Sequence, residues 1–193
     1  MKKRELRISF NSPVVLWFAL ISLAALILSG VTGGASTVKV FSVYRSSLTD
    51  PLTWVRFICH VFGHASWEHF IGNITLLLVV GPMLEEKYGS GSILTVILVT
   101  AVITGAVQFI FFPKTALLGA SGVVFALILL SSFTSIREGS IPVTFILVAL
   151  IYIGGQVYDG IFVQDNISNL THILGGAVGA AMGFAMIRNK KGS

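Results

Sequence analysis

The chain has 193 residues, of which 54% are hydrophobic and 11% are charged, and its formal net charge is +5. About a quarter of the residues of a soluble domain are charged, so this composition excludes an ordinary soluble protein and indicates a polytopic membrane protein of one domain. The basic residues gather at the ends of apolar stretches, which favours the lipid bilayer over nucleic acid as the partner of this charge.

The apolar stretches predict an all-α membrane protein with six membrane-spanning helices in one domain over residues 13–187. A basic segment, residues 1–12, comes first. Ser12 as a capping residue, followed by Pro13 in the first turn, is typical of a helix start. A cleaved signal peptide is the competing interpretation of the first stretch, although this stretch is longer than a usual signal core. The predicted spans cover about 14–30, 69–86, 93–112, 121–136, 142–157 and 168–187.

A long connection joins the first two spans, and a basic tail, residues 188–193, follows the last one. The connection contains Trp54 and Trp67 among apolar and basic residues, which suits an element that lies in the membrane interface. Six spans place both termini on one side, and the distribution of Lys and Arg predicts that this side is cytoplasmic. The inner segments then carry Lys2, Lys3, Arg4, Arg7, Lys87, Arg137, Arg188, Lys190 and Lys191, and the outer segments carry Lys39, Arg45, Arg56 and Lys114.

In this topology the second, fourth and sixth spans run inward from the outer face, and each begins with polar residues. Ser121 opens the fourth span, His172 lies about one turn into the sixth, and His69 and Asn73 lie in the first two turns of the second. At about 1.5 Å per residue, all four lie in the outer third of the bilayer. The fourth span is only about 24 Å long against roughly 30 Å of hydrocarbon, so residues 114–120 should dip inward as irregular, shielded backbone.

Ser121 and His172 are the candidate nucleophile and general base of a hydrolase that works below the membrane surface. A serine hydroxyl needs a base to take its proton, and no aspartate lies near His172 in the sequence, so a dyad is predicted instead of a triad. Asn73 and His69 are four residues apart on one helix face. Together with the Ser121 backbone N–H, they could stabilise a tetrahedral oxyanion.

Five neighbouring residues have supporting roles in this interpretation. Gly119 and Gly122 allow a tight turn on either side of Ser121. Gly175 and Gly179 form a G-x-x-x-G face below His172, which allows the sixth span to approach the fourth closely. Phe125 lies four residues after Ser121 on the same face, where its ring could pack against the imidazole.

Each feature also has an ordinary structural explanation. A lone serine in a membrane helix usually bonds its own backbone, and a lone G-x-x-x-G usually serves helix packing. His60 and His64 fit loop or interface residues better than metal ligands, because no carboxylate or cysteine completes a site, so no metal is expected. A transporter or channel would be expected to carry intramembrane charges or internal symmetry. The shared depth of the polar residues favours catalysis over these alternatives.

These residues together resemble the rhomboid family of intramembrane serine proteases, over about residues 54–187. Gly119 to Gly122 resembles the G-x-S-G motif, and His172 with Gly175 and Gly179 resembles the H-x-x-G-x-x-x-G of the last core helix. The remaining similarities are His69 to Asn73 with the H-x-x-x-N of the second helix, Glu86 to Ser90 with an E-x-x-x-G-S turn, Arg56 with the arginine of the first loop, and Phe125 at a position where bacterial members often have tyrosine.

The resemblance implies a six-helix rhomboid-like bundle with a long first loop, without a cofactor, that cleaves transmembrane protein substrates near the outer face of the cell membrane. Both termini would be cytoplasmic, and the lack of a separate extramembrane domain suggests a small prokaryotic form. A catalytically silent rhomboid-like protein that binds or escorts transmembrane helices is the alternative. The physiological substrate and the oligomeric state stay open.

Overall fold

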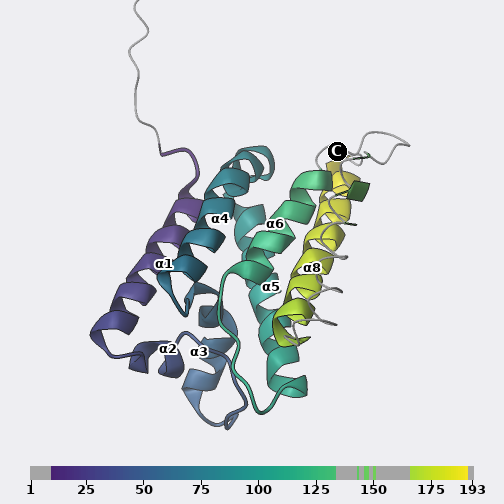
Figure 1. Cartoon of the computed structure of the whole chain (residues 1–193). Helices are drawn as coiled ribbons and strands as arrows, with labels where there is room; N and C mark the ends of the chain where they lie inside the picture. The colour runs from purple at the N-terminus through teal and green to yellow at the C-terminus, as the bar shows by residue number, and fades with distance from the viewer. Residues whose placement is uncertain (1–9, 134–142, 144–145, 148–149, 151–165, 191–193) are drawn as a thin grey trace, which may run out of the picture.

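The computed structural model describes residues 10–133 and 166–190, with single positions at 143, 146, 147 and 150 (Figure 1). Most of these residues are helical. The long helices are α1 (Pro13–Val31), α4 (Trp67–Tyr88), α5 (Ser90–Phe111), α6 (Ser121–Phe133) and α8 (Asn166–Lys190). The short elements α2 (Ala35–Lys39), α3 (Pro51–Cys59) and the 3-10 turn η1 (His60–Phe62) lie between α1 and α4.

Three of the described helices, α1, α4 and α5, are long and apolar enough to cross a membrane. Shorter apolar stretches, Ser121–Ser132 and Leu170–Ala185, lie within α6 and α8. These helices overlap five of the six ranges in which a span is expected. The remaining range, 142–157, falls largely outside the described residues, so the count of six spans stays a prediction.

The long helices form a bundle in which α4, α6 and α8 run in the same direction, whereas α1 and α5 run the opposite way (Figure 1). The core between them is apolar, as expected for helices whose inward faces carry branched aliphatic side chains. Fully buried members include Leu77, Leu84, Ile93, Leu127 and Leu130. The parallel arrangement brings the N-terminal turns of α4, α6 and α8 to the same part of the molecule.

The N-terminus of α1 is capped by a side chain from α4. The Glu85 carboxylate accepts the backbone N–H groups of Val14 and Val15, at 3.0 Å each, and the Ser90 hydroxyl at 2.7 Å. A carboxylate at this position satisfies two N–H groups that have no partner inside the helix and complements the helix dipole. Pro13 occupies the first turn as expected, but the prediction that Ser12 caps the helix is wrong, because its side chain makes no capping bond.

The E-x-x-x-G-S similarity is also corrected by this geometry. Glu85 lies four residues before Gly89, so the spacing of the motif belongs to Glu85 and not to Glu86. The Glu86 carboxylate is exposed and accepts only the Asn11 amide at 2.8 Å among the described residues. Glu85 therefore joins α1, α4 and α5 at one end of the bundle.

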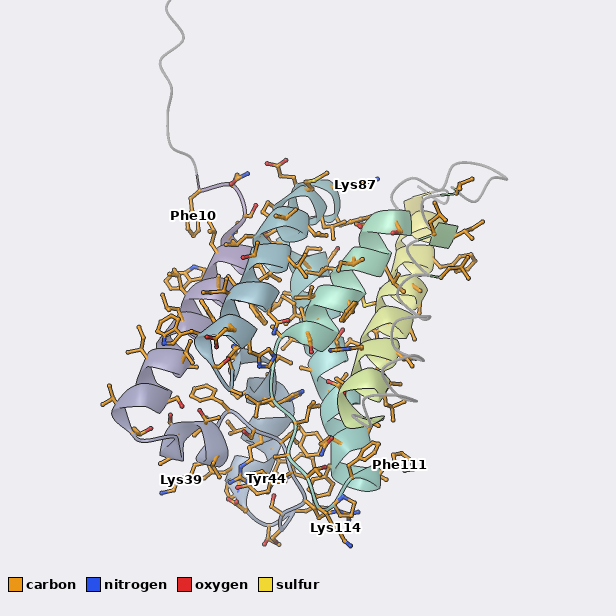
Figure 2. All side chains as sticks on the ribbon, viewed as in Figure 1. Phe10, Lys39, Tyr44, Lys87, Phe111 and Lys114 are labelled. Carbon is orange, nitrogen blue, oxygen red and sulfur yellow. The ribbon has the colours of Figure 1, made fainter. Side chains whose placement is uncertain are left out.

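The connection between α1 and α4, residues 32–66, lies at the opposite end of the bundle, where Figure 2 labels Lys39 and Tyr44. Arg56 organises it from a side chain that is only 4% exposed. Its guanidinium donates to the Lys39 carbonyl at 2.9 Å and to the Ser46 hydroxyl at 3.2 Å, and lies 3.4 Å from the Asp50 carboxylate. We call residues 32–66 the first connection.

Residues 112–120 lead from α5 to α6 without a helix, in agreement with the irregular backbone predicted for residues 114–120. Leu117 pairs with Val43 of the first connection through two backbone hydrogen bonds of 2.9 Å. Gly119 and Ala120, at the end of the segment, are buried. The two residues directly before Ser121 are thus shielded by protein, as irregular backbone must be at membrane depth, whereas residues 113–116 are exposed.

Candidate active site

The site begins at the seam between α6 and α8, where the two backbones are in contact. A Cβ added to Gly175 would overlap the carbonyl of Gly122, and a Cβ added to Gly179 would overlap the carbonyl of Ala126. Only glycine fits at either position of α8, because the atoms opposite are backbone atoms that cannot turn away. The close approach expected from the G-x-x-x-G face is present, and α6 is the helix that it meets.

Gly122 has a different role from the one predicted. It lies in the first turn of α6 and is not among the glycines with positive φ, whereas Gly119 has a φ of +127°. A Cβ at Gly122 would make ordinary contacts, 3.4 Å from Thr171 and 3.5 Å from Thr104. The prediction of a tight turn on either side of Ser121 is confirmed for Gly119 and wrong for Gly122. Gly122 instead contributes its backbone carbonyl to the contact with Gly175.

The seam holds the ring of His172 against α6. The centroids of the His172 and Phe125 rings are 4.5 Å apart, with an angle of 48° between the planes. Phe125 lies one helical turn after Ser121 on the same face of α6. Ser121, Phe125 and His172 are each half-buried, so the groups that carry the proposed chemistry retain some access. Packing of Phe125 on the imidazole therefore agrees with the sequence prediction.

His69 and Asn73 meet the segment that enters Ser121. A Cβ built on Gly119 would lie 2.9 Å from both Cε1 and Nε2 of His69, and 4.0 Å from Nδ2 of Asn73. The Ser66 hydroxyl caps α4 by accepting the His69 backbone N–H at 3.2 Å, which fixes His69 in the first turn. The structure therefore brings the two residues predicted as oxyanion donors beside the backbone two residues before Ser121.

The Asn73 side chain is buried, at 8% exposure, yet its Nδ2 has no hydrogen-bond partner among the residues that the structure describes. An unpaired buried N–H group costs about 1–3 kcal/mol, so such groups call for an explanation. A donor that is kept free for an anion formed during a reaction is one explanation. Ser121, as the first residue of α6, adds a backbone N–H that has no partner within the helix.

His60 supports the site from behind, a role that the sequence did not predict. Its carbonyl accepts the Gly119 N–H at 2.9 Å, and its ring lies between the Arg56 carbonyl at 3.1 Å and the Thr104 hydroxyl at 3.2 Å. Burial lowers the pKa of His60 to about 4, so the imidazole is neutral at pH 7. His60 lies in the first connection, as expected of a loop residue, but its burial at 1% exposure was not predicted.

Gln108 of α5 was also missed by sequence reasoning. Its Nε2 donates to the Thr115 carbonyl and hydroxyl, both at 3.0 Å, and thereby ties the irregular segment before Ser121 to α5. The only signal in the sequence is a single amide in an apolar span, where polar side chains are costly and usually have a function. His60 and Gln108 fix the path of the backbone that presents Ser121.

Comparison with known proteins identifies the family of the chain. The family model named Rhomboid domain matches residues 51–189 of the chain. Rhomboid-related protein 1 of Caenorhabditis elegans is 28% identical over 143 residues, and Rhomboid-related protein 2 of Mus musculus is 30% identical over 161 residues. The matched regions cover 69% and 72% of this chain, but only 40% and 53% of the worm and mouse proteins.

A bacterial relative matches over a larger share of its own length. Rhomboid protease GlpG of Haemophilus influenzae is 30% identical over 150 residues, which cover 75% of this chain and 75% of that protein. With its long apolar helices, the chain is a membrane protein. The family model covers well over half of the sequence, and the chain therefore belongs to the rhomboid family.

Proposed function

We propose that this protein is an intramembrane serine endopeptidase that cleaves transmembrane segments of membrane proteins through a Ser121–His172 dyad. The observation that supports it most is the position of the His172 ring against Phe125, one turn from Ser121, on helices whose backbones touch at Gly175 and Gly122. A nucleophile and a base carried by separate helices need such a rigid seam, because an error of about 1 Å in their alignment costs roughly a hundredfold in rate.

In the first half of the reaction, the Ser121 Oγ attacks the carbonyl carbon of the scissile peptide bond while His172 accepts the hydroxyl proton. The tetrahedral intermediate then collapses to an ester between Ser121 and the carboxyl fragment. His172 returns the proton to the departing amine. In the second half, His172 takes a proton from water, whose oxygen attacks the ester carbonyl carbon. His172 then returns the proton to the Ser121 Oγ as the bond to the carboxyl fragment breaks.

The negative charge on the tetrahedral oxygen would be met by three N–H donors. Two are the side chains of His69 and Asn73, which lie beside Gly119, and the third is the backbone N–H of Ser121. The Asn73 Nδ2 has no hydrogen-bond partner among the described residues, so no existing bond has to break when it donates to the anion. No metal or cofactor takes part in these steps.

The substrates proposed are transmembrane segments that can unwind near the outer face of the cell membrane. The polar site lies at the N-terminal ends of α4, α6 and α8, on the side of the bundle that holds the first connection (Figure 1). With both termini cytoplasmic, this side faces outward. A catalytically silent protein that binds transmembrane helices is the competing function, and it would share the fold but not the chemistry.

Labelling with a fluorophosphonate probe tests the nucleophile directly. We expect the wild-type protein in detergent to be labelled and Ser121→Ala to be unlabelled, whereas Ser132→Ala should be labelled like the wild type. Ser132 is a matched control, because it lies in the same helix and, among the described residues, its hydroxyl bonds only the Ile128 carbonyl, at 3.2 Å. Equal labelling of Ser121→Ala and the wild type would contradict the proposal.

Cleavage of a single-pass substrate with small or helix-breaking residues near its outer end tests the dyad. Both Ser121→Ala and His172→Ala should abolish cleavage while their thermal unfolding midpoints stay close to that of the wild type. A wild-type protein that binds such a substrate without cleaving it, and that no fluorophosphonate labels, would favour the silent alternative.

The orientation can be tested separately by cysteine labelling in intact cells. In a Cys59→Ser background, Lys114→Cys should react with a membrane-impermeant maleimide from outside. Lys87→Cys, at the other end of the bundle in Figure 2, should react only after permeabilisation. The reverse pattern would contradict the cytoplasmic placement of the termini.

A further inference from the structure

His64 is a buried histidine that the proposed chemistry does not use. It lies just after η1 and is 1% exposed. Its Nδ1 lies 3.2 Å from the Phe62 carbonyl, which fixes the proton on Nδ1 and leaves Nε2 as an acceptor. This Nε2 is buried and has no hydrogen-bond partner within the part of the chain that the structure describes. A phenyl ring would avoid that cost, so the imidazole calls for an explanation.

The ring of His64 lies edge-on to the ring of His69. Their centroids are 5.1 Å apart with an interplanar angle of 68°, a T-shaped contact. His64 makes a second T-shaped contact with Phe70, at 5.4 Å and 86°. The bond to the Phe62 carbonyl prevents the His64 ring from turning in this position, so the edge that it presents to its neighbours is fixed.

The His69 ring also borders the backbone of Gly119, which leaves no room for a side chain there. His69 Nδ1 accepts the Ala65 N–H at a long 3.5 Å, an assignment that places the proton of a neutral His69 on Nε2. Nε2 is the nitrogen that lies beside Gly119. A small rotation of the ring would move this N–H away from the carbonyl that Ser121 attacks, and the Ala65 contact alone is too weak to prevent it.

Burial and the neighbouring His69 lower the pKa of His64 to about 4. His64 is therefore neutral at pH 7, and it packs against His69 without charge repulsion. A lysine or arginine at this position would repel a protonated neighbour and would need water for its own charge.

We propose that His64 is a positioning residue, whose buried ring holds His69 against Gly119 so that the His69 Nε2–H points to the developing oxyanion. The inference rests on the proposed function, because it concerns a donor of that same reaction. It adds a residue that acts on the reaction only through His69.

A double-mutant cycle on kcat tests this role. Four proteins are compared on one single-pass substrate: the wild type, His64→Ala, His69→Ala and the double variant. We expect His64→Ala to lower kcat roughly tenfold with KM unchanged, which is less than the loss of a whole oxyanion donor. In the His69→Ala background, the same change should lower kcat less than about twofold, because the group that His64 positions is gone.

An equal loss of kcat in both backgrounds would overturn the inference, since His64 would then act on the fold or on another group. If His64→Ala does not fold, His64→Phe serves in the same cycle. It keeps a ring beside His69 but loses the bond to the Phe62 carbonyl, so we expect a smaller loss of kcat that again vanishes with His69→Ala. An inactive wild type, or a Ser121→Ala variant as active as the wild type, would instead show failure of the proposed function.

Discussion

The α6–α8 seam and the first connection both position the candidate site, but they use different physical means. At the seam, Gly175 and Gly179 bring one backbone against the carbonyls of another, and the contact depends on the absence of side-chain atoms. In the first connection, buried polar side chains carry the structure, with Arg56 and His60 each making several hydrogen bonds. Gly119 links the two regions, because its N–H bonds the His60 carbonyl and the chain enters α6 two residues later.

The difference teaches where each region tolerates change. A backbone contact has no rotamers with which to absorb an added atom, so a single methyl group must move a whole helix. A network of several hydrogen bonds can lose one partner and keep the others, although the loss of its central charge leaves buried acceptors unpaired. The seam should therefore respond steeply to size, whereas the first connection should respond to polarity and pH.

The largest effect is expected for Gly175→Ala. The added methyl overlaps the Gly122 carbonyl, so α8 must shift and carry His172 away from Ser121. We expect a loss of about 3 kcal/mol in stability and of roughly a hundredfold in kcat. Thermal unfolding in detergent and cleavage of a single-pass substrate measure the two effects.

Two alanine variants serve as controls for this prediction. Gly122→Ala makes only ordinary contacts across the same seam, so its unfolding midpoint should stay near that of the wild type. Gly72→Ala, in α4, places its methyl in open space and should be neutral or slightly stabilising, as expected when glycine leaves a helix. Equal destabilisation by all three alanines would contradict the prediction, because the cost would then not come from the overlap with the Gly122 carbonyl.

Much of the seam could be predicted from the sequence, because its signals are local. Gly175, Gly179 and Phe125 are read from their spacing along single helices, and the shared direction of α4, α6 and α8 follows from alternating spans. Gly122 was misassigned because glycine serves both positive φ and close packing, and residue type alone does not separate these uses. The Ser121–His172 dyad itself stays a prediction that only chemistry can test.

The hydrogen bonds of Glu85 and His60 could not be predicted, because each joins segments far apart in the chain. Glu85 caps α1 by accepting the N–H of Val14, 71 positions earlier in the chain, and His60 bonds Thr104 across 44 positions. Nothing in the sequence near Ser12 indicates that a carboxylate from α4 caps α1 in its place. Such partners depend on the tertiary arrangement, which composition and periodicity do not specify.

Arg56→Met should give the next largest effect, and it tests the polarity of the first connection. The change keeps much of the apolar stem but leaves the Lys39 carbonyl and the Ser46 hydroxyl without their donor. We expect a loss of about 2 kcal/mol in stability, with a smaller loss of kcat than Gly175→Ala causes. Arg45→Met is the control, because Arg45 is exposed and donates only to the Ile110 carbonyl among the described residues. Similar unfolding midpoints for the two methionine variants would contradict the central role of Arg56.

His60 should make the stability of the first connection depend on pH. Its pKa is about 4 in the folded protein, against 6.5 in an unfolded chain. Between these values the unfolded chain takes up a proton that the folded protein does not, so stability falls as the pH is lowered through 6.5 toward 4. We expect this residue alone to cost about 2 kcal/mol at pH 5 relative to pH 8.

His60→Gln isolates this contribution, because glutamine keeps a hydrogen-bonding side chain but does not titrate. The variant is expected to be less stable than the wild type at pH 8, and the difference should shrink or reverse at pH 5. Gly175→Ala keeps His60, so its unfolding should retain the dependence on pH that His60 gives the wild type. Parallel pH profiles of unfolding for wild type and His60→Gln would refute the assignment.

The smallest effect is expected for Glu85→Gln, which extends the comparison to the other end of the bundle. Glutamine keeps one carbonyl oxygen for the α1 N–H groups but loses the charge that complements the helix dipole, so we expect a loss of about 1 kcal/mol. Glu86→Gln, one residue away and exposed, should change the unfolding midpoint little. Because Glu85 is tied to α1 and not to the segment before Ser121, kcat should be preserved in both variants. A loss of kcat in Glu85→Gln as large as that in Arg56→Met would contradict this expectation. It would mean that the two ends of the bundle are coupled through α4, so that the site depends on the Glu85 hydrogen bonds as well as on the first connection.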